Sequence, residues 1–188
     1  MMGRPVCSCV KVLLVTLSLA ACAENKPSNT RNFGIFRQKN EGYSILYSLM
    51  IDESRVADIF FIKHASDDVG NLVRQIAATA KAAKAKMDDF RKADNRIDYD
   101  VQDLPLIEDQ SRQAARSEDT KALLGSSGKN FELRLLFTQA QAMMYTHDLC
   151  SALLAAEDDP ARKTFLSDLA NQSEKFYESL LDLLQVKG

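Results

Sequence analysis

Residues 67–90 have the sequence DDVGNLVRQIAATAKAAKAKMDDF, and the spacing of their apolar side chains decides the fold. These side chains recur at steps of three and four residues, at Val69, Val73, Ile76, Ala80, Ala83, Met87 and Phe90. This period is typical of one face of an α-helix that packs against other helices. Because many residues between these positions are alanines, the helix is thin and its neighbours can approach closely. We therefore take a long helix as the centre of the fold.

The same apolar seam extends backward through Ile59, but the sequence also carries signals for a break. Ser66 offers an N-cap oxygen, and Gly70 weakens the first turn of any helix that runs through it. An unbroken helix of about 40 residues would be about 60 Å long, far longer than its neighbours. The sequence therefore predicts a short helix near 53–65 and a long helix near 67–93.

Three further helices are expected over about 105–124, 129–157 and 160–186. Glycines at 125 and 128 can end one helix and cap the next, and Asp159-Pro160 provides an N-cap followed by proline at the first helical position. Short connections make neighbouring helices antiparallel, and no alternating strand pattern is present. We expect an all-α fold, an up-and-down four-helix bundle with an extra N-terminal helical segment, in a domain over residues 43–188.

The N-terminus has the pattern of an export signal. Arg4 and Lys11 supply positive charge, and residues 12–21 form an apolar stretch that suits a signal peptide but is too short to span a bilayer. The stretch ends in Leu19-Ala20-Ala21-Cys22, which resembles the lipobox of bacterial lipoproteins. The alternative is an ordinary signal peptide that happens to carry a cysteine.

This resemblance implies cleavage between Ala21 and Cys22, and lipid chains on the sulfur and new amino group of Cys22. Several acyl chains anchor a protein stably where one does not. Residues 1–21 would be the signal peptide, and residues 22–42 the lipidated cysteine with a flexible tether. The domain would then lie in the periplasm of the cell envelope. Ala23 replaces the aspartate that marks inner-membrane retention in many lipoproteins, which favours the outer membrane.

Cleavage would change both the cysteine count and the charge. Cys7 and Cys9 would leave with the signal and Cys22 would carry lipid, so Cys150 would remain alone and no internal disulfide could form. Loss of Arg4 and Lys11 would leave 22 basic against 26 acidic residues, a net charge of −4. A mildly acidic surface argues against a nucleic-acid partner, since a basic face supplies most of that affinity.

One helical face carries side chains that could bind a soft metal or haem. The candidates are Met143, Met144, His147 and Cys150, at helical spacing in the segment 129–157. The structural alternative is that the methionines and the cysteine fill core space and that His147 bonds a neighbour at the bundle core. We expect no cofactor and no metal, because one helix cannot complete a coordination sphere and no facing helix offers another histidine or cysteine.

The remaining sequence contains no catalytic pattern. The layout resembles ferritin-like bundles, but their Glu-x-x-His motif is missing, because Met144 stands three residues before His147. The loop at 125–129 lacks the spacing of a phosphate-binding loop. Isolated acidic residues are interpreted as solvated side chains, namely Glu132, Glu157, Glu174 and Glu178.

These observations favour a membrane-anchored cell-envelope lipoprotein that acts as a helical binding or scaffold module without catalysis. Its partner would be another envelope protein, in addition to the membrane that holds the lipid. The alternative is a metal- or haem-binding bundle centred on His147, and an enzyme comes third. The sequence leaves the oligomeric state open.

Overall fold

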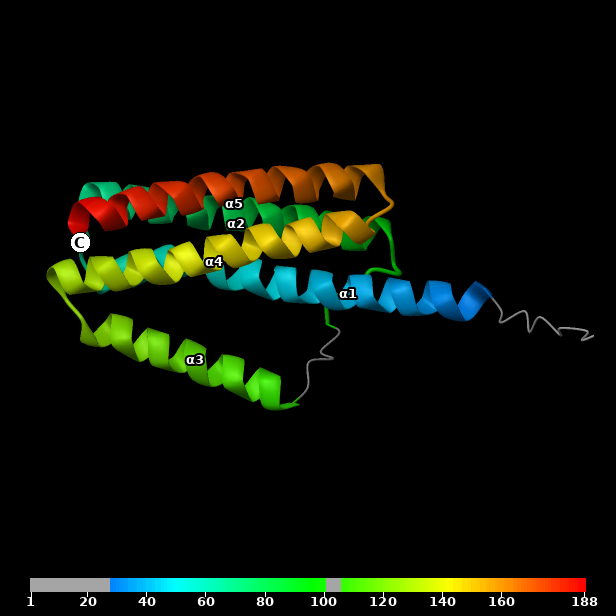
Figure 1. Cartoon of the computed structure of the whole chain (residues 1–188), viewed down its shortest axis with the longest axis horizontal. Coiled ribbons are helices and arrows are strands. Elements are labelled where there is room, and N and C mark those ends of the chain that lie inside the picture. Colours follow the sequence, from blue (N-terminus) through cyan, green and yellow to red (C-terminus); the bar gives the residue numbers. More distant parts are fainter. Residues whose placement is uncertain (1–27, 101–105) are drawn as a thin grey trace, which may run out of the picture.

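The computed structural model describes residues 28–100 and 106–188 of the chain, and the elements in those ranges are helices (Figure 1). Their bounds are α1 Ser28–Glu53, the 3-10 helix η1 Val56–Phe61, α2 Asp67–Ala93, α3 Leu106–Gly125, α4 Gly128–Ala156 and α5 Pro160–Lys187. Neither described range contains a strand, so the expected all-α bundle is confirmed. None of the described helices is long and apolar enough to cross a bilayer.

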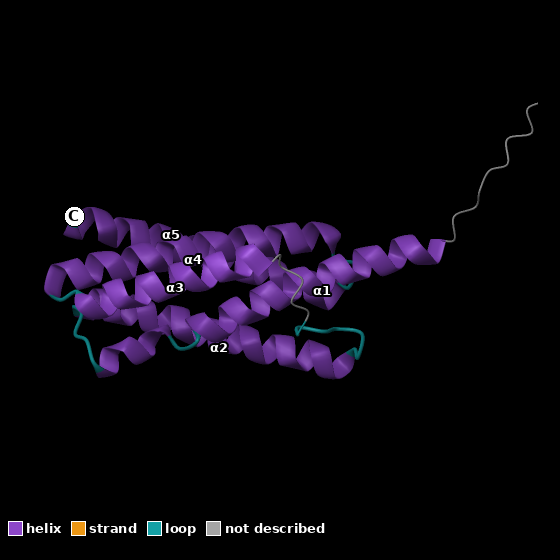
Figure 2. Cartoon of the chain, turned by 90° about the horizontal axis from the view of Figure 1, so that it is seen from below, coloured by secondary structure: helices purple, strands orange, loops and turns teal. Residues whose placement is uncertain are grey.

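Four helices pack together, and they are not the four that the sequence suggested. α4 and α5 form the most extensive pair, and α1 and α2 pack beside them, whereas α3 contacts α4 from outside (Figures 1 and 2). No side chain of α3 is buried, and Leu106 and Ile107 at its start are exposed. α1 is the fourth helix of the bundle, because its side chains Tyr43, Leu46 and Met50 are buried in the core.

α1 also corrects the expected N-terminal boundary. Residues 28–42 belong to this helix rather than to a tether, and Asn40 is buried. Gly42 lets α1 approach α4 closely, because a Cβ there would lie 2.7 Å from Cδ2 of Leu153. The predicted helix at 53–65 is wrong, since α1 ends at Glu53 and only one short 3-10 helix follows before α2. Cys22, Ala21 and the signal segment lie outside the described residues.

The two ends of the bundle differ in what they bring together. At the proximal end, the turn 157–159 joins α4 to α5. At the distal end, α1 leads through η1 to α2, α4 begins and α5 ends, so α2 and α4 run in the same direction (Figure 1). α3, which lies between α2 and α4 in the sequence, brings the chain back from the proximal side to the distal end.

Two groups of buried side chains fill the bundle. The proximal group includes Leu46, Met50, Met87, Cys150 and Leu166, and the distal group includes Val69, Val73, Ile76, Phe131, Leu135, Leu136 and Leu180. The predicted seam of α2 is confirmed from Val69 to Met87, because its apolar side chains are buried, namely Val69, Val73, Ile76, Ala80, Ala83 and Met87.

Candidate functional site

The side chains around His147 do not all face the same way. Met143 and Cys150 are buried, but Met144 is 47% exposed, because consecutive helical residues point about 100° apart. His147 is half-buried rather than central, and its Nδ1 lies 3.3 Å from the carbonyl oxygen of Ala170 on α5. This contact matches the structural interpretation, in which His147 bonds a neighbour.

The chemistry at this face is that of packing. Burial raises the pKa of the Cys150 thiol to about 12, so the reactive thiolate is disfavoured. Within the described ranges, no group of three His, Cys, Asp or Glu side chains lies close enough to hold a metal ion. The sulfur-containing side chains that the sequence predicted on one helical face are divided, since Met143 and Cys150 are in the core and Met144 is on the surface.

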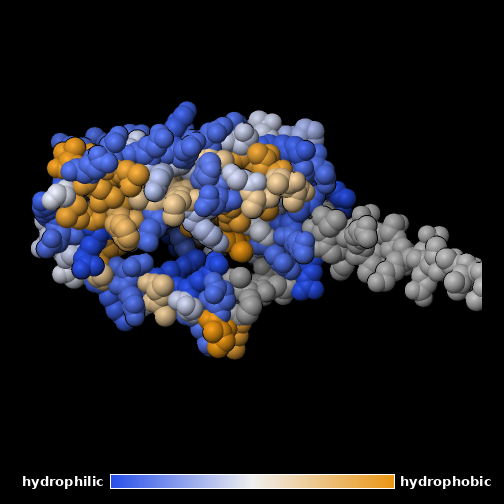
Figure 3. All heavy atoms as spheres, in the orientation of Figure 1, coloured by the Kyte–Doolittle hydropathy of each residue, from blue (hydrophilic) through white to orange (hydrophobic). Residues whose placement is uncertain are grey.

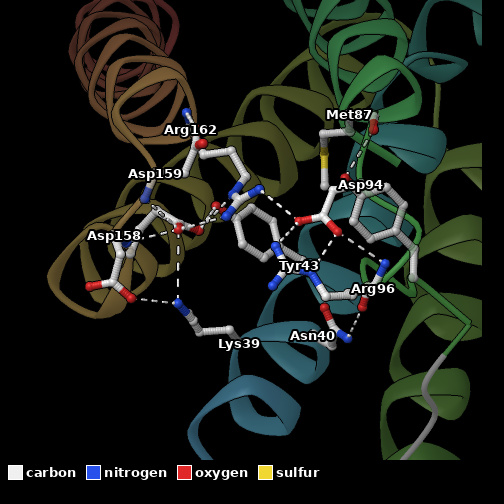
Figure 4. A network of polar contacts seen from close by, with 11 residues as sticks. Lys39, Asn40, Tyr43, Met87, Asp94, Arg96, Asp158, Asp159 and Arg162 are labelled. Atoms are coloured by element: carbon white, nitrogen blue, oxygen red, sulfur yellow. Dashed lines mark hydrogen bonds and ion pairs between the residues drawn. The ribbon is translucent and has the colours of Figure 1, made fainter. Parts of the chain in front are cut away.

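A polar cluster surrounds Glu157 at the proximal end, a residue that we expected to be solvated; Figure 4 labels its partners Tyr43, Asp158, Asp159 and Arg162. Only 1% of the Glu157 side chain is exposed. Its carboxylate accepts hydrogen bonds from the Tyr43 hydroxyl at 2.7 Å, from Arg162 at 3.0 and 3.1 Å, and from the N–H groups of Asp158 and Asp159 at 2.8 and 3.0 Å. Burial alone would raise the pKa of Glu157, but these donors lower it to about 2.

The cluster continues across the end of α2. Arg162 reaches Asp94 at 3.8 Å, and Asp94 accepts hydrogen bonds from the Arg96 guanidinium at 2.7 and 2.8 Å. Asn40 donates to the Arg96 carbonyl at 3.0 Å, which ties α1 to the same loop (Figure 4). Because its central carboxylate is enclosed and its oxygens are bonded, this cluster holds three segments together and offers no reactive group.

The distal end presents exposed apolar side chains, as does the start of α3 with Leu106 and Ile107. Phe61 is 87% exposed, Ile62 68%, Leu124 44% and Val186 82%, and we call these four residues the distal surface. They come from η1, from the ends of α3 and α5, and from the residue that follows η1. Large apolar side chains that gather on one surface are typical of sites that bind another molecule, whereas single ones are common.

Hydrogen bonds bring the segments of the distal surface together. Lys63 donates to the Ser126 carbonyl at 2.8 Å, which joins the loop after η1 to the α3–α4 turn. Lys187 donates to the Ser66 hydroxyl at 2.8 Å and pairs with Glu132 at 3.0 Å, which joins the end of α5 to the starts of α2 and α4. Glu132 is therefore paired, although we expected it to be solvated, whereas Glu174 and Glu178 are exposed as expected.

Beside the distal surface, α3 encloses an open hollow with α4. Its volume is about 620 Å³, and it is lined by Ala122, Gly125, Ser126, Asn130, Leu133 and Arg134. Figure 3 shows the molecule hollowed between α3 and the bundle, with largely hydrophilic walls. α4 begins at Gly128, directly after the turn from α3, and the φ of 54° at this residue favours glycine.

Few contacts hold α3 in place. Arg116 pairs with Asp52 at 3.0 Å, Arg112 donates to the Tyr145 hydroxyl at 3.3 Å, and Leu123 packs against the distal core. Exposed ion pairs contribute only about 0–1 kcal/mol each. α3 is therefore the least firmly held helix, and sequence reasoning missed this because its helical pattern resembles that of its neighbours.

Comparison with known proteins adds no family to these observations. No family model, no curated protein and no solved structure matches this chain.

Proposed function

We propose that this protein is a lipid-anchored module of the bacterial cell envelope that binds another envelope protein through its distal surface. The observation that carries the proposal is the exposure of Phe61, Ile62 and Val186 at one end of the bundle. Burying a large apolar side chain fully contributes about 1.5–3 kcal/mol, so a partner that covers these three gains several kcal/mol. No catalytic group is needed for such a role.

The direction of α1 fits this arrangement. α1 begins at the end of the molecule away from the distal surface, and a lipid on Cys22 would precede its first residue, Ser28, by six positions (Figure 1). α4 has 29 residues, so the bundle is roughly 40 Å long. A domain tethered in this way directs its apolar end away from the anchoring membrane.

The hollow beside α3 extends the same surface. Its lining includes the polar side chains of Asn130 and Arg134 and the α3–α4 turn, which follows Leu124 of the distal surface. Apolar centres with a polar rim are the usual composition of protein–protein interfaces. The partner is therefore expected to offer an apolar segment that covers the distal surface and a polar segment that reaches the hollow.

Site-specific photo-crosslinking in intact cells tests this proposal. A photoreactive phenylalanine analogue at Phe61 or Val186 should give the same adduct with a second protein. The matched control positions are Ala161 and Thr164, which are exposed at the proximal end and should give no such adduct. Ile62→Glu should abolish the adduct at both distal positions.

Three outcomes would contradict the proposal. The first is equal crosslinking from both ends of the bundle, and the second is no adduct from either distal position. The third is an adduct with twice the mass of the chain, which would identify a second copy as the occupant of the distal surface.

A further inference from the structure

Two buried oxygens in the described part of the chain have no hydrogen-bond partner, and they belong to adjacent side chains. One is Oε2 of Glu53, the last residue of α1, and the other is Oε1 of Gln139 on α4. Glu53 is 7% exposed and Gln139 4%. Gln139 lies close enough to act on the Glu53 carboxyl, so α1 and α4 meet here through polar groups within the core.

An ionised Glu53 cannot satisfy both oxygens. A carboxylate only accepts hydrogen bonds, so the amide of Gln139 can donate to it, but the amide oxygen gains nothing in return. A buried acceptor without a partner costs about 1–3 kcal/mol. A carboxylic acid also donates, and its hydroxyl can bond the amide oxygen while its carbonyl accepts from the amide nitrogen.

We propose that Glu53 holds a proton in the folded protein and donates it in a hydrogen bond to Oε1 of Gln139. The pair is then a buried proton-binding site at the contact between α1 and α4. A single proton satisfies both unpartnered oxygens and removes a negative charge from the core. This inference is independent of the proposed binding function.

The position of Glu53 in the helix disfavours its charge. It is the last residue of α1, where the unpaired carbonyl groups create a negative potential that opposes an anion. Two charged side chains also act on it. Asp52, on the same helix, disfavours ionisation, whereas Arg116, which reaches in from α3 to pair with Asp52, favours it; the facing group on α4 is the neutral Gln139.

These influences agree with the protonation of Glu53. Burial raises the pKa of Glu53 from 4.5 to about 7, and Asp52 adds to that rise, whereas Gln139 and Arg116 oppose it. The site therefore loses its proton near neutral pH. Because the folded pKa is raised, the site stabilises the fold fully below pH 4.5 and stops doing so as the pH rises through about 7.

The side-chain carboxyl signals of carbon-13-labelled glutamate in the purified full chain test this site directly. Glu53, identified by the loss of its signal in Glu53→Gln, should titrate near pH 7, whereas the exposed Glu174 should keep an ordinary midpoint. Asp52→Asn should lower the Glu53 midpoint, and Arg116→Gln should raise it. A midpoint near 4.5 in the unmodified chain would overturn the proposal.

A second measurement tests the partner of the proton. At pH 5 the infrared difference spectrum between the unmodified chain and Glu53→Gln should contain the carbonyl band of a protonated carboxylic acid. Gln139→Met deletes the amide, so the band should move to the higher frequency of an acid without a hydrogen-bond partner. A band at the same frequency in Gln139→Met would show that the proton is not shared with Gln139.

Discussion

The hydroxyl of Tyr43 donates a hydrogen bond of 2.7 Å to Oε2 of Glu157, and the two residues are 114 positions apart in the chain. The bond joins α1 to the turn that follows α4. Glu157 also accepts from Arg162 and from two backbone N–H groups, so one carboxylate holds the proximal end closed. This relationship gives the first prediction.

Tyr43→Phe should reduce the free energy of unfolding by about 1.5–3 kcal/mol, because hydrogen bonds to charged groups contribute in that range. The matched control is Tyr177→Phe on α5, whose hydroxyl has no hydrogen bond within the described ranges and whose loss should cost little. Urea denaturation of both variants measures the difference. Equal stabilities would contradict the importance of the Tyr43–Glu157 bond.

The pH dependence of stability should have two limbs of opposite sign. The pKa of Glu157 is lowered to about 2, so its stabilisation of about 3 kcal/mol is present above pH 4.5 and is lost as the pH falls through about 2. The pKa of Glu53 is raised to about 7, so its contribution of about 3 kcal/mol is lost as the pH rises through that value. Considering these two groups, stability should be greatest near pH 4–5.

Unfolding curves between pH 2 and 8 check both limbs. Glu53→Gln should remove the decrease between pH 4.5 and 7 and leave the acid limb intact. Glu157→Gln should weaken the acid limb and leave the neutral one. A wild-type stability that rises steadily from pH 4.5 to 7, with the same rise in Glu53→Gln, would rule out a proton on Glu53.

Cys22→Ser should abolish labelling of the protein by a clickable fatty acid and block lipoprotein-type processing, because Cys22 alone follows the Leu19-Ala20-Ala21 context. Cys9→Ser changes a cysteine before the expected cleavage point and should leave labelling unchanged. Metabolic labelling followed by gel electrophoresis distinguishes the two. Persistent labelling of Cys22→Ser would mean that the resemblance to a lipobox is misleading.

Arg116→Ala should loosen α3 without unfolding the bundle. The Arg116–Asp52 pair is exposed and contributes at most about 1 kcal/mol to global stability, but it is one of the few contacts that α3 makes. Hydrogen exchange of the α3 amides should therefore accelerate, while that of α2 and α5 stays unchanged. Lys121→Ala, at an exposed position of the same helix, should change neither.

Local patterns predicted the helices well where the period was regular. α2 begins at Asp67 and ends at Ala93, as the seam indicated, and α4 and α5 lie within one residue of their expected bounds. Ser66 occupies the N-cap position of α2, but its hydroxyl makes no capping hydrogen bond. The expected helix at 53–65 failed because Ile59 continued the apolar spacing by coincidence. Tyr43, Leu46 and Met50 extend α1 instead, and their polar N-terminal neighbours concealed it.

Tertiary relationships could not be predicted in this way. The apolar spacing in α3 indicates a helix but does not say where that helix packs. α3 stays outside the bundle because α1 occupies the position that α3 was expected to fill. Glu157 stands at a helix end, where acidic residues are usually solvated, and its partner Tyr43 is too distant in the sequence to suggest burial. Gln139 similarly gave no sign that it faces Glu53.

The route of the chain through α3 has a practical consequence for engineering. Because α2 and α4 run in the same direction, the segment between Ala93 and Gly128 must cover most of the length of the bundle, roughly 40 Å. An extended chain covers about 3.3 Å per residue, so a spacer of at least about a dozen residues could replace α3. The four packed helices would then become a smaller scaffold, in which Ile97 and Tyr99 must be kept because they are buried in the proximal core.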